Sequence, residues 1–214
     1  MSRLPNWVRQ HLAAIRALIV LTVITGVIYP LVVYGIAQAA FNHQANGSLV
    51  TSHGKVAGSS LLCQQFVGSK GNALPQYFQE RPSAASDPAA KSTTAEAQGC
   101  DPLFSGASNL GPNNQKLLTN VNANRKAAAQ LNGVSPNSVP PDAVTASGSG
   151  LDPDISPQYA YQQVNRVAQA RHLDPAKVRA LVTSHIQGRT IGFLGEPRVD
   201  VLQLNLALDQ GQAG

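Results

Sequence analysis

The chain has 214 residues, enough for one sizeable domain with an appendage, and a formal net charge of +5. Three of the positive charges are Arg3, Arg9 and Arg16, whereas the part after residue 40 carries 13 Lys and Arg against 11 Asp and Glu. No basic run interleaved with aromatic residues occurs. This distribution argues against a nucleic-acid-binding protein and places the basic excess at the N-terminus.

An uncharged apolar run, residues 17–37, follows these arginines. At about 1.5 Å per residue, a helix of this length reaches roughly 30 Å, the thickness of the hydrocarbon core of a bilayer. Arginines on one flank hold that flank in the cytoplasm. We therefore predict a cytoplasmic segment at 1–16, a membrane-spanning helix at 17–40 and an extracytoplasmic domain at 41–214.

Two other interpretations of the apolar run stay open. Ala37-Gln38-Ala39 has the small-x-small form of a signal-peptide cleavage site, although the apolar part of a signal peptide usually spans only about 7–15 residues. A buried helix of a soluble protein would carry a polar face, which this run lacks. An uncleaved anchor is the interpretation that we favour.

Small residues recur inside the predicted helix. Thr22 and Gly26 lie four residues apart, as do Gly35 and Ala39, and such pairs let a second helix approach closely. Pro30 removes one backbone hydrogen bond and should bend the helix. Both features are also common in membrane helices in general, so a packing role and no particular role remain equally open.

The first part of the predicted domain contains strand and loop signals. Residues 48–80 suggest strands around SSLLCQQF and LPQYFQE. Residues 82–102 are rich in Ala, Ser, Thr and Pro and lack large apolar side chains, so they cannot build a core. We expect a surface loop at about 82–107.

Helix signals are clearer in the second half. Residues 113–132 are rich in helix formers and end before Gly133, a typical residue after a helix C-terminus. The leucines of this helix, with Val121 and Leu131, could form one buried stripe. Ser156-Pro157 and Asp174-Pro175 each place a capping residue before a proline, which predicts two further helices.

The last of these helices is expected to end at Gly188. Residues 198–209 then alternate between apolar and polar side chains with nearly period two, which indicates a strand with one buried face. Helices and strands are mixed without a βαβ rhythm, so we predict an α+β domain behind a single membrane helix.

Catalytic motifs are scarce. The chain has neither the Asp-Lys-Thr-Gly-Thr nucleophile motif of P-type pumps nor G-x-S-x-G, and its five histidines show no metal-ligand spacing. His172 and His185 stand near predicted helix ends, where capping is the commoner role. Asp152 and Asp154 flank a proline and are better explained as turn and helix-start residues than as an acid–base pair.

The two cysteines, Cys63 and Cys100, enclose 36 residues. If the domain lies outside the cytoplasm they occupy an oxidising space, where we expect them to pair. Closing such a loop contributes about 3–4 kcal/mol in the chain-entropy model. Two free thiols are the alternative.

Residues 147–150 read Ser-Gly-Ser-Gly. A phosphate-binding loop needs glycines that bare the backbone N–H groups, and normally a helix directly behind them. Ser147, Gly148, Ser149 and Gly150 supply only G-x-G, without the Lys-Ser/Thr pair of a Walker motif. A structural turn is the favoured interpretation.

Five stretches of the chain, taken in order, resemble a single family over nearly the whole length: the small C subunit of the Kdp potassium-transporting ATPase of bacteria. One departure is Cys63, where most members have glycine, and another is the long Ala/Ser/Thr stretch before Ser108. Both fit a local embellishment closed by a disulfide. The stretches are TGVIYPLVVYGIAQAAF (25–41), YFQERPSA (77–84), SNLGP (108–112), VTASGSGLDPDISP (144–157) and HIQGRTIGFLGEPRVDVLQLNLAL (185–208).

The resemblance implies a non-catalytic accessory subunit of a high-affinity potassium pump in the bacterial cytoplasmic membrane. Its implied partners are a channel-like subunit, which holds the selectivity filter, and a P-type subunit, which uses ATP and Mg²⁺ and carries the phosphorylated aspartate. The C subunit is set over the channel-like subunit and itself binds no cofactor. It stabilises the complex and covers potassium entry.

Two alternatives follow. The family is also described as assisting ATP binding, partly through Ser147–Gly150, which would make the chain a nucleotide-binding chaperone of the P-type subunit. The predicted topology places that motif away from cytoplasmic ATP. An anchored binding domain independent of any pump is the other alternative. For the accessory subunit, Glu196 and Arg198 are the predicted partner-facing loop residues.

Overall fold

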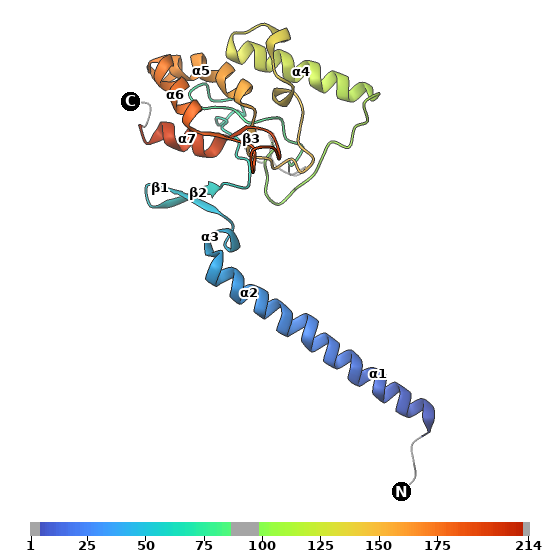
Figure 1. The fold of residues 1–214 in the computed structure, drawn as a ribbon. Helices are drawn as coiled ribbons and strands as arrows, with labels where there is room; N and C mark the ends of the chain where they lie inside the picture. Colours follow the sequence, from blue (N-terminus) through green and yellow to red (C-terminus); the bar gives the residue numbers. More distant parts are fainter. Residues whose placement is uncertain (1–4, 87–98, 212–214) are drawn as a thin grey trace. The chain divides into compact units, whose positions relative to one another are not determined.

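The computed structural model describes residues 5–86 and 99–211, and the chain divides into two compact units, Met1–Ser48 and Leu49–Gly214 (Figure 1). The expected surface loop at about 82–107 falls partly on residues 87–98, which lie outside the described residues.

The first unit is dominated by one long helix. It runs through α1 (Asn6–Val23), the π-helical turn η1 (Ile24–Ile28) and α2 (Tyr29–Ala40), and its 35 residues include a window with mean hydropathy 2.3. It is therefore long and apolar enough to cross a membrane. The helix starts at Asn6, well before residue 17, where the apolar run begins.

The π-helical turn lies immediately before Pro30. Proline has no N–H, so the carbonyl of Gly26 lacks the donor that an α-helix would provide four residues later. A wider turn with i→i+5 bonds takes up this irregularity. After Ala40 the chain makes one short helix, α3 (Asn42–Ala45), before the second unit begins.

The second unit opens with an antiparallel hairpin, β1 (Leu49–Ser52) and β2 (Lys55–Ser59). Of the strands expected within residues 48–80, the structure has β1 and β2, whereas none forms over the rest of SSLLCQQF or over LPQYFQE. Residues 61–85 instead follow an irregular path, in which side-chain amides from two distant helices bind the backbone of Phe78 and Gln79.

The three helices expected in the second half are present as α4 (Gln115–Asn132), α5 (Pro157–Arg171) and α6 (Pro175–Ser184). Gly133 follows α4 with φ +64°, a conformation that glycine adopts at little cost. The Ser156 hydroxyl accepts from the N–H of Tyr159 at the start of α5, and Asp174 caps α6 in the same way. These capping predictions are confirmed.

A small antiparallel sheet joins the C-terminal elements in the order β3 (Asp154–Ile155), β5 (Arg198–Asp200) and β4 (Ile186–Gln187). Helix α6 stops at Ser184 rather than Gly188 because the following residues enter this sheet. The remaining turns include two short 3₁₀ helices, η3 (Pro136–Ser138) and η4 (Pro141–Ala143).

The strand predicted over 198–209 is present only as far as Asp200, and the rest forms a helix, α7 (Val201–Asp209). Asp200 caps this helix by accepting from the N–H of Gln203. Six of its nine residues are buried, Asn205 among them, so α7 is enclosed nearly all round. A helix of this kind has no polar face from which a 3.6-residue period could be recognised.

The core lies between α5, α6 and α7, which pack side by side (Figure 1). Its fully buried side chains include Phe78 from the irregular path, Val164 and Val167 from α5, Val182 from α6 and Leu204 from α7. The expected mixture of helices and strands behind one apolar N-terminal helix is confirmed.

Candidate functional site

A segment that opens with a turn at residues 75–77 and runs to residue 85, called the extended segment, crosses the second unit without belonging to any strand. Two buried amides hold it. Asn205 on α7 donates to the carbonyl of Phe78 at 2.9 Å and accepts from its N–H at 2.8 Å. Gln163 on α5 does the same for Gln79, at 3.1 and 2.7 Å. Each amide reproduces the double exchange of hydrogen bonds that a neighbouring strand would make.

Arg166 on α5 fixes the beginning of the extended segment. Its guanidinium donates to the carbonyls of Pro75 and Tyr77, to Oδ1 of Asn132 and to Oε1 of Gln163. Burial lowers the pKa of Arg166 to about 10, so the group remains charged at neutral pH. One buried cation thus ties α4, α5 and the extended segment together.

Glu80, the next residue along the segment, is buried and incompletely paired. Its Oε1 accepts from the N–H of Gln64 at 3.4 Å, and its Oε2 has no partner among the described residues. Burial raises the pKa of this carboxyl well above its ordinary value, and the nearby Asp200 raises it further. We therefore expect Glu80 to hold a proton well above the pH at which an exposed glutamate loses it.

Two other acidic groups near Glu80, Asp152 and Asp154, have cationic partners. Arg81 binds Asp152 at 2.7 Å, and Arg198 binds Asp154 at 2.9 Å. Burial raises the pKa of Asp154 to about 6, partly offset by Arg198. Among the described residues, no group of three or more His, Cys, Asp or Glu side chains is arranged to hold a metal ion. Asp152 also accepts from the N–H of Asp154, which is the expected turn role.

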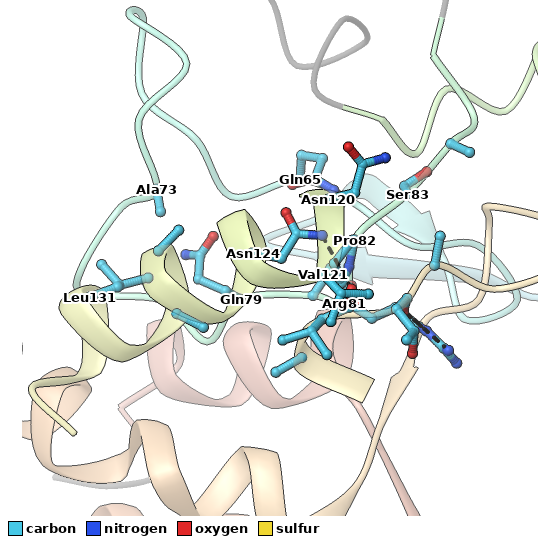
Figure 2. Close-up of a pocket in the computed structure, with 18 of the residues that line it drawn as sticks. Gln65, Ala73, Gln79, Arg81, Pro82, Ser83, Asn120, Val121, Asn124 and Leu131 are labelled. Atoms are coloured by element: carbon cyan, nitrogen blue, oxygen red, sulfur yellow. Dashed lines mark hydrogen bonds between the residues drawn. The ribbon is translucent and has the colours of Figure 1, made fainter. Parts of the chain in front are cut away.

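A cleft of about 1070 Å³, the α4 cleft, lies between α4 and the extended segment (Figure 2). Leu117, Val121 and Leu131 of α4 line it and are only half-buried. These residues were predicted to form a buried stripe, and that prediction was wrong. Smaller residues, Ala128 and Ala129, are the buried contacts of α4 with the core, Val121 packs against the core while lining the cleft, and Leu117 and Leu131 line the cleft.

The Ser/Gly motif packs as a turn against the extended segment. The carbonyl of Ser149 accepts from the N–H of Gly106, and the carbonyl of Gly150 accepts from the hydroxyl of Ser83. Gly150 is buried with φ +71°. No helix stands directly behind the motif, since α5 begins only at Pro157. These contacts are those of a structural turn.

Cys63 and Cys100 form a disulfide with their Cα atoms 5.4 Å apart. The bridge packs against Ala85 and Leu151 in a small cluster separate from the main core. The Ser83 hydroxyl also accepts from the N–H of Cys100. The disulfide therefore fastens the end of the extended segment and the Ser/Gly turn to the residues around Cys100.

The loop between β4 and β5 carries an exposed apolar tip, made of Ile191, Phe193 and Leu194, whose exposed fractions are 76%, 70% and 50%. Ile191 has φ +51°, a conformation that is strained for a β-branched residue. Arg189 binds Glu196 at 2.7 Å across the base of the loop.

The model of one protein family, described as "KdpC: K+-transporting ATPase, c chain", matches residues 11–210. The chain belongs to the KdpC family. It is 45% identical over 216 residues to the potassium-transporting ATPase KdpC subunit of Streptomyces avermitilis, covering 96% of this chain and 95% of that protein. It is 48% identical over 208 residues to the KdpC subunit of Bradyrhizobium diazoefficiens, covering 96% and 98%. The resemblance predicted from five sequence stretches is thus confirmed.

Those KdpC stretches lie in different parts of the fold. Glu196 and Arg198 do not pair with each other, because Arg198 turns toward Asp154 in the sheet. His172 ends α5 with φ +56°, and His185 ends α6 with its ring bonded to the carbonyl of Leu181. Capping is therefore the role that the structure gives both histidines.

The apolar helix of the first unit leaves the predicted packing residues uncovered. Thr22, Gly26, Pro30 and Gly35 are exposed, and a side chain added at Gly35 would meet nothing within 4 Å. The two small residues Gly26 and Gly35 thus leave space on the helix surface.

Sequence reasoning missed the two amides and the arginine that hold the extended segment. Gln163 and Arg166 are polar residues that interrupt the buried face of α5, and Asn205 lies in a stretch that was interpreted as a strand. A polar residue that falls on a buried helix face is the signal that could have found the first two, since buried polar groups require partners.

Proposed function

We propose that this chain is a non-catalytic accessory subunit that stabilises a potassium pump and covers potassium entry to a channel-like subunit. The proposal rests on one observation, that a KdpC-family chain joins a single helix able to cross a membrane to a folded, disulfide-bonded domain. Its proposed partners are the channel-like subunit and the P-type subunit, and the latter uses ATP and Mg²⁺. This chain binds neither.

The domain is proposed to lie outside the cytoplasm. Arg3, Arg9 and Arg16 precede the apolar helix, and arginines on one flank favour a cytoplasmic N-terminus. The Cys63–Cys100 disulfide supports the same orientation, because disulfides persist in oxidising compartments. In this orientation the Ser/Gly turn is separated from cytoplasmic ATP. The nucleotide-binding alternative is therefore disfavoured twice, because the motif is separated from ATP and lacks the geometry of a phosphate loop.

Two surfaces are proposed to contact the partner subunits. Small residues at Thr22, Gly26 and Gly35, with the irregularity before Pro30, would let a partner helix approach the membrane helix closely. In the second unit, the loop carrying Glu196 and Arg198 presents the apolar tip, whose strained backbone supports a role in contact.

The placement of the domain can be tested with the native chain, because all six lysines lie after residue 54. A membrane-impermeant amine reagent applied to spheroplasts should modify the exposed lysines Lys116, Lys126 and Lys177 without opening of the membrane. Peptide mass spectrometry measures the modification, and lysines of a cytoplasmic protein serve as the control. Modification only after the membrane is opened would contradict the proposed topology.

The stabilising role can be tested at the apolar tip. Phe193→Ser should reduce the amount of partner subunits that co-purify with the tagged chain by about tenfold or more, since an exposed aromatic anchor commonly dominates an interface. Leu103→Ser is the matched control, because Leu103 is 85% exposed and lies outside the loop. Both variants should resist proteolysis like the parent chain. Undiminished recovery with Phe193→Ser would count against this contact.

A further inference from the structure

We propose that the α4 cleft binds an extended peptide segment of another subunit of the ATPase, which pairs with the backbone of residues 80–84. The inference rests on the proposed role as a complex subunit. The proposed site differs from the apolar tip, because the α4 cleft would recognise its partner through backbone hydrogen bonds and the tip through exposed apolar side chains.

The unpaired backbone of the extended segment carries the argument. The amides of Asn205 and Gln163 satisfy Phe78 and Gln79. Beyond Gln79, the N–H groups of residues 80, 81, 83 and 84 and the carbonyls of residues 80–83 bond to none of the described residues. Backbone groups without a protein partner are uncommon in partly buried chain, and a row of them is the template on which a further strand adds.

The opposite wall suits the side chains of such a strand. Leu117, Val121 and Leu131 of α4 line the cleft and stay half-buried. In an extended peptide, alternate side chains point to opposite faces. A peptide paired with residues 80–84 could turn every second side chain toward these apolar residues, and small or apolar residues at those positions fit best.

The polar residues of the cleft favour a peptide over an anion. Figure 2 shows Gln79, Arg81 and Asn124 along the cleft, and the first two belong to the extended segment. The guanidinium of Arg81 is engaged by Asp152 and by the carbonyl of Thr145. Asn124 donates to the carbonyl of Val144. The one cation of the described lining is thus neutralised, and the walls are held in place before any ligand enters.

The size of the cleft agrees with this class of ligand. Its volume of about 1070 Å³ lies at the upper end of the range of about 300–1000 Å³ that is usual for small-molecule pockets, so it has room for a short peptide. A single metabolite would leave the row of backbone groups largely unpaired, whereas a short stretch of polypeptide offers a donor or acceptor at each position.

Hydrogen exchange of the full chain, alone in detergent and in the purified complex, tests the inference directly. We expect the N–H groups among residues 80, 81, 83 and 84 that pair with the peptide to exchange roughly tenfold or more slowly in the complex. Asn120→Trp, which places an indole in the cleft, should abolish this protection. Asn122→Trp is the control, since Asn122 lies on the same helix and is exposed outside the cleft.

Each outcome decides between the two proposals. If the complex is recovered and residues 80–84 exchange equally fast with and without it, or are already protected in the isolated chain, the peptide site is overturned while the accessory role stands. Equal effects of Asn120→Trp and Asn122→Trp would overturn it as well. If no partner subunit co-purifies with the parent chain, the proposed function fails, and this inference with it.

Discussion

Replacing Arg166 by methionine should lower the free energy of unfolding by about 3–4 kcal/mol, because methionine matches the length of the arginine stem but donates no hydrogen bond. The carbonyl of Pro75 and Oδ1 of Asn132 would lose their donor, and the carbonyl of Tyr77 would keep only the side-chain amide of Gln79. Leaving one such buried acceptor unpaired costs about 1–3 kcal/mol, and water can reach only some of them. The loss is a large part of the stability of a typical domain, about 5–15 kcal/mol.

Urea unfolding of the full chain in detergent, followed by pulse proteolysis, measures this effect. Arg179→Met is the matched control, since Arg179 lies on the exposed face of α6 and only stacks on Tyr161 at 4.7 Å. Its contribution should stay within about 1 kcal/mol. Equal losses in the two variants would show that Arg166 does not hold the extended segment in the way described here.

The ends of the helices could be predicted from the sequence, whereas the pairing of distant segments could not. Ser156, Asp174 and Gly133 act within a few residues of their own helix, so their types and positions predict the ends of three helices. The bonds of Phe78 with Asn205 and of Gln79 with Gln163 join residues 127 and 84 positions apart. No periodic pattern in a single sequence indicates which distant residues will bind each other.

The errors at α7 and α4 have a common cause. Residues 201–209 alternate as a strand would, but burial on nearly all sides removes the polar face that distinguishes a helix. In α4, Leu117 and Val121 have the spacing of a buried stripe, yet they face the α4 cleft. The spacing of apolar residues predicts which of them share a helix face. Only tertiary packing decides whether that face contacts the core or lines a cleft.

The surroundings of the two glycines in the Ser/Gly motif distinguish a structural turn from a phosphate loop. A side chain on Gly150 would lie 2.6 Å from the carbonyl oxygen of Gly106 and 2.7 Å from Cβ of Ala85. Gly148 has nothing within 4 Å of the corresponding position. A phosphate loop needs both glycines bare so that the anion can approach the backbone. A packed turn needs only the one that is crowded.

We therefore expect Gly150→Ala to destabilise the domain by about 2–4 kcal/mol, the sum of a strained left-handed residue and of overpacking against backbone atoms that cannot withdraw. Gly148→Ala should change stability by less than about 0.5 kcal/mol. The same urea and proteolysis assay compares them, and potassium uptake by cells carrying each variant gives the functional result. A turn predicts that uptake follows stability, with Gly148→Ala indistinguishable from the parent chain. Loss of uptake in a stable Gly148→Ala chain that still recovers its partner subunits would instead restore the nucleotide-binding interpretation, because a ligand approaching that glycine would detect the added methyl group.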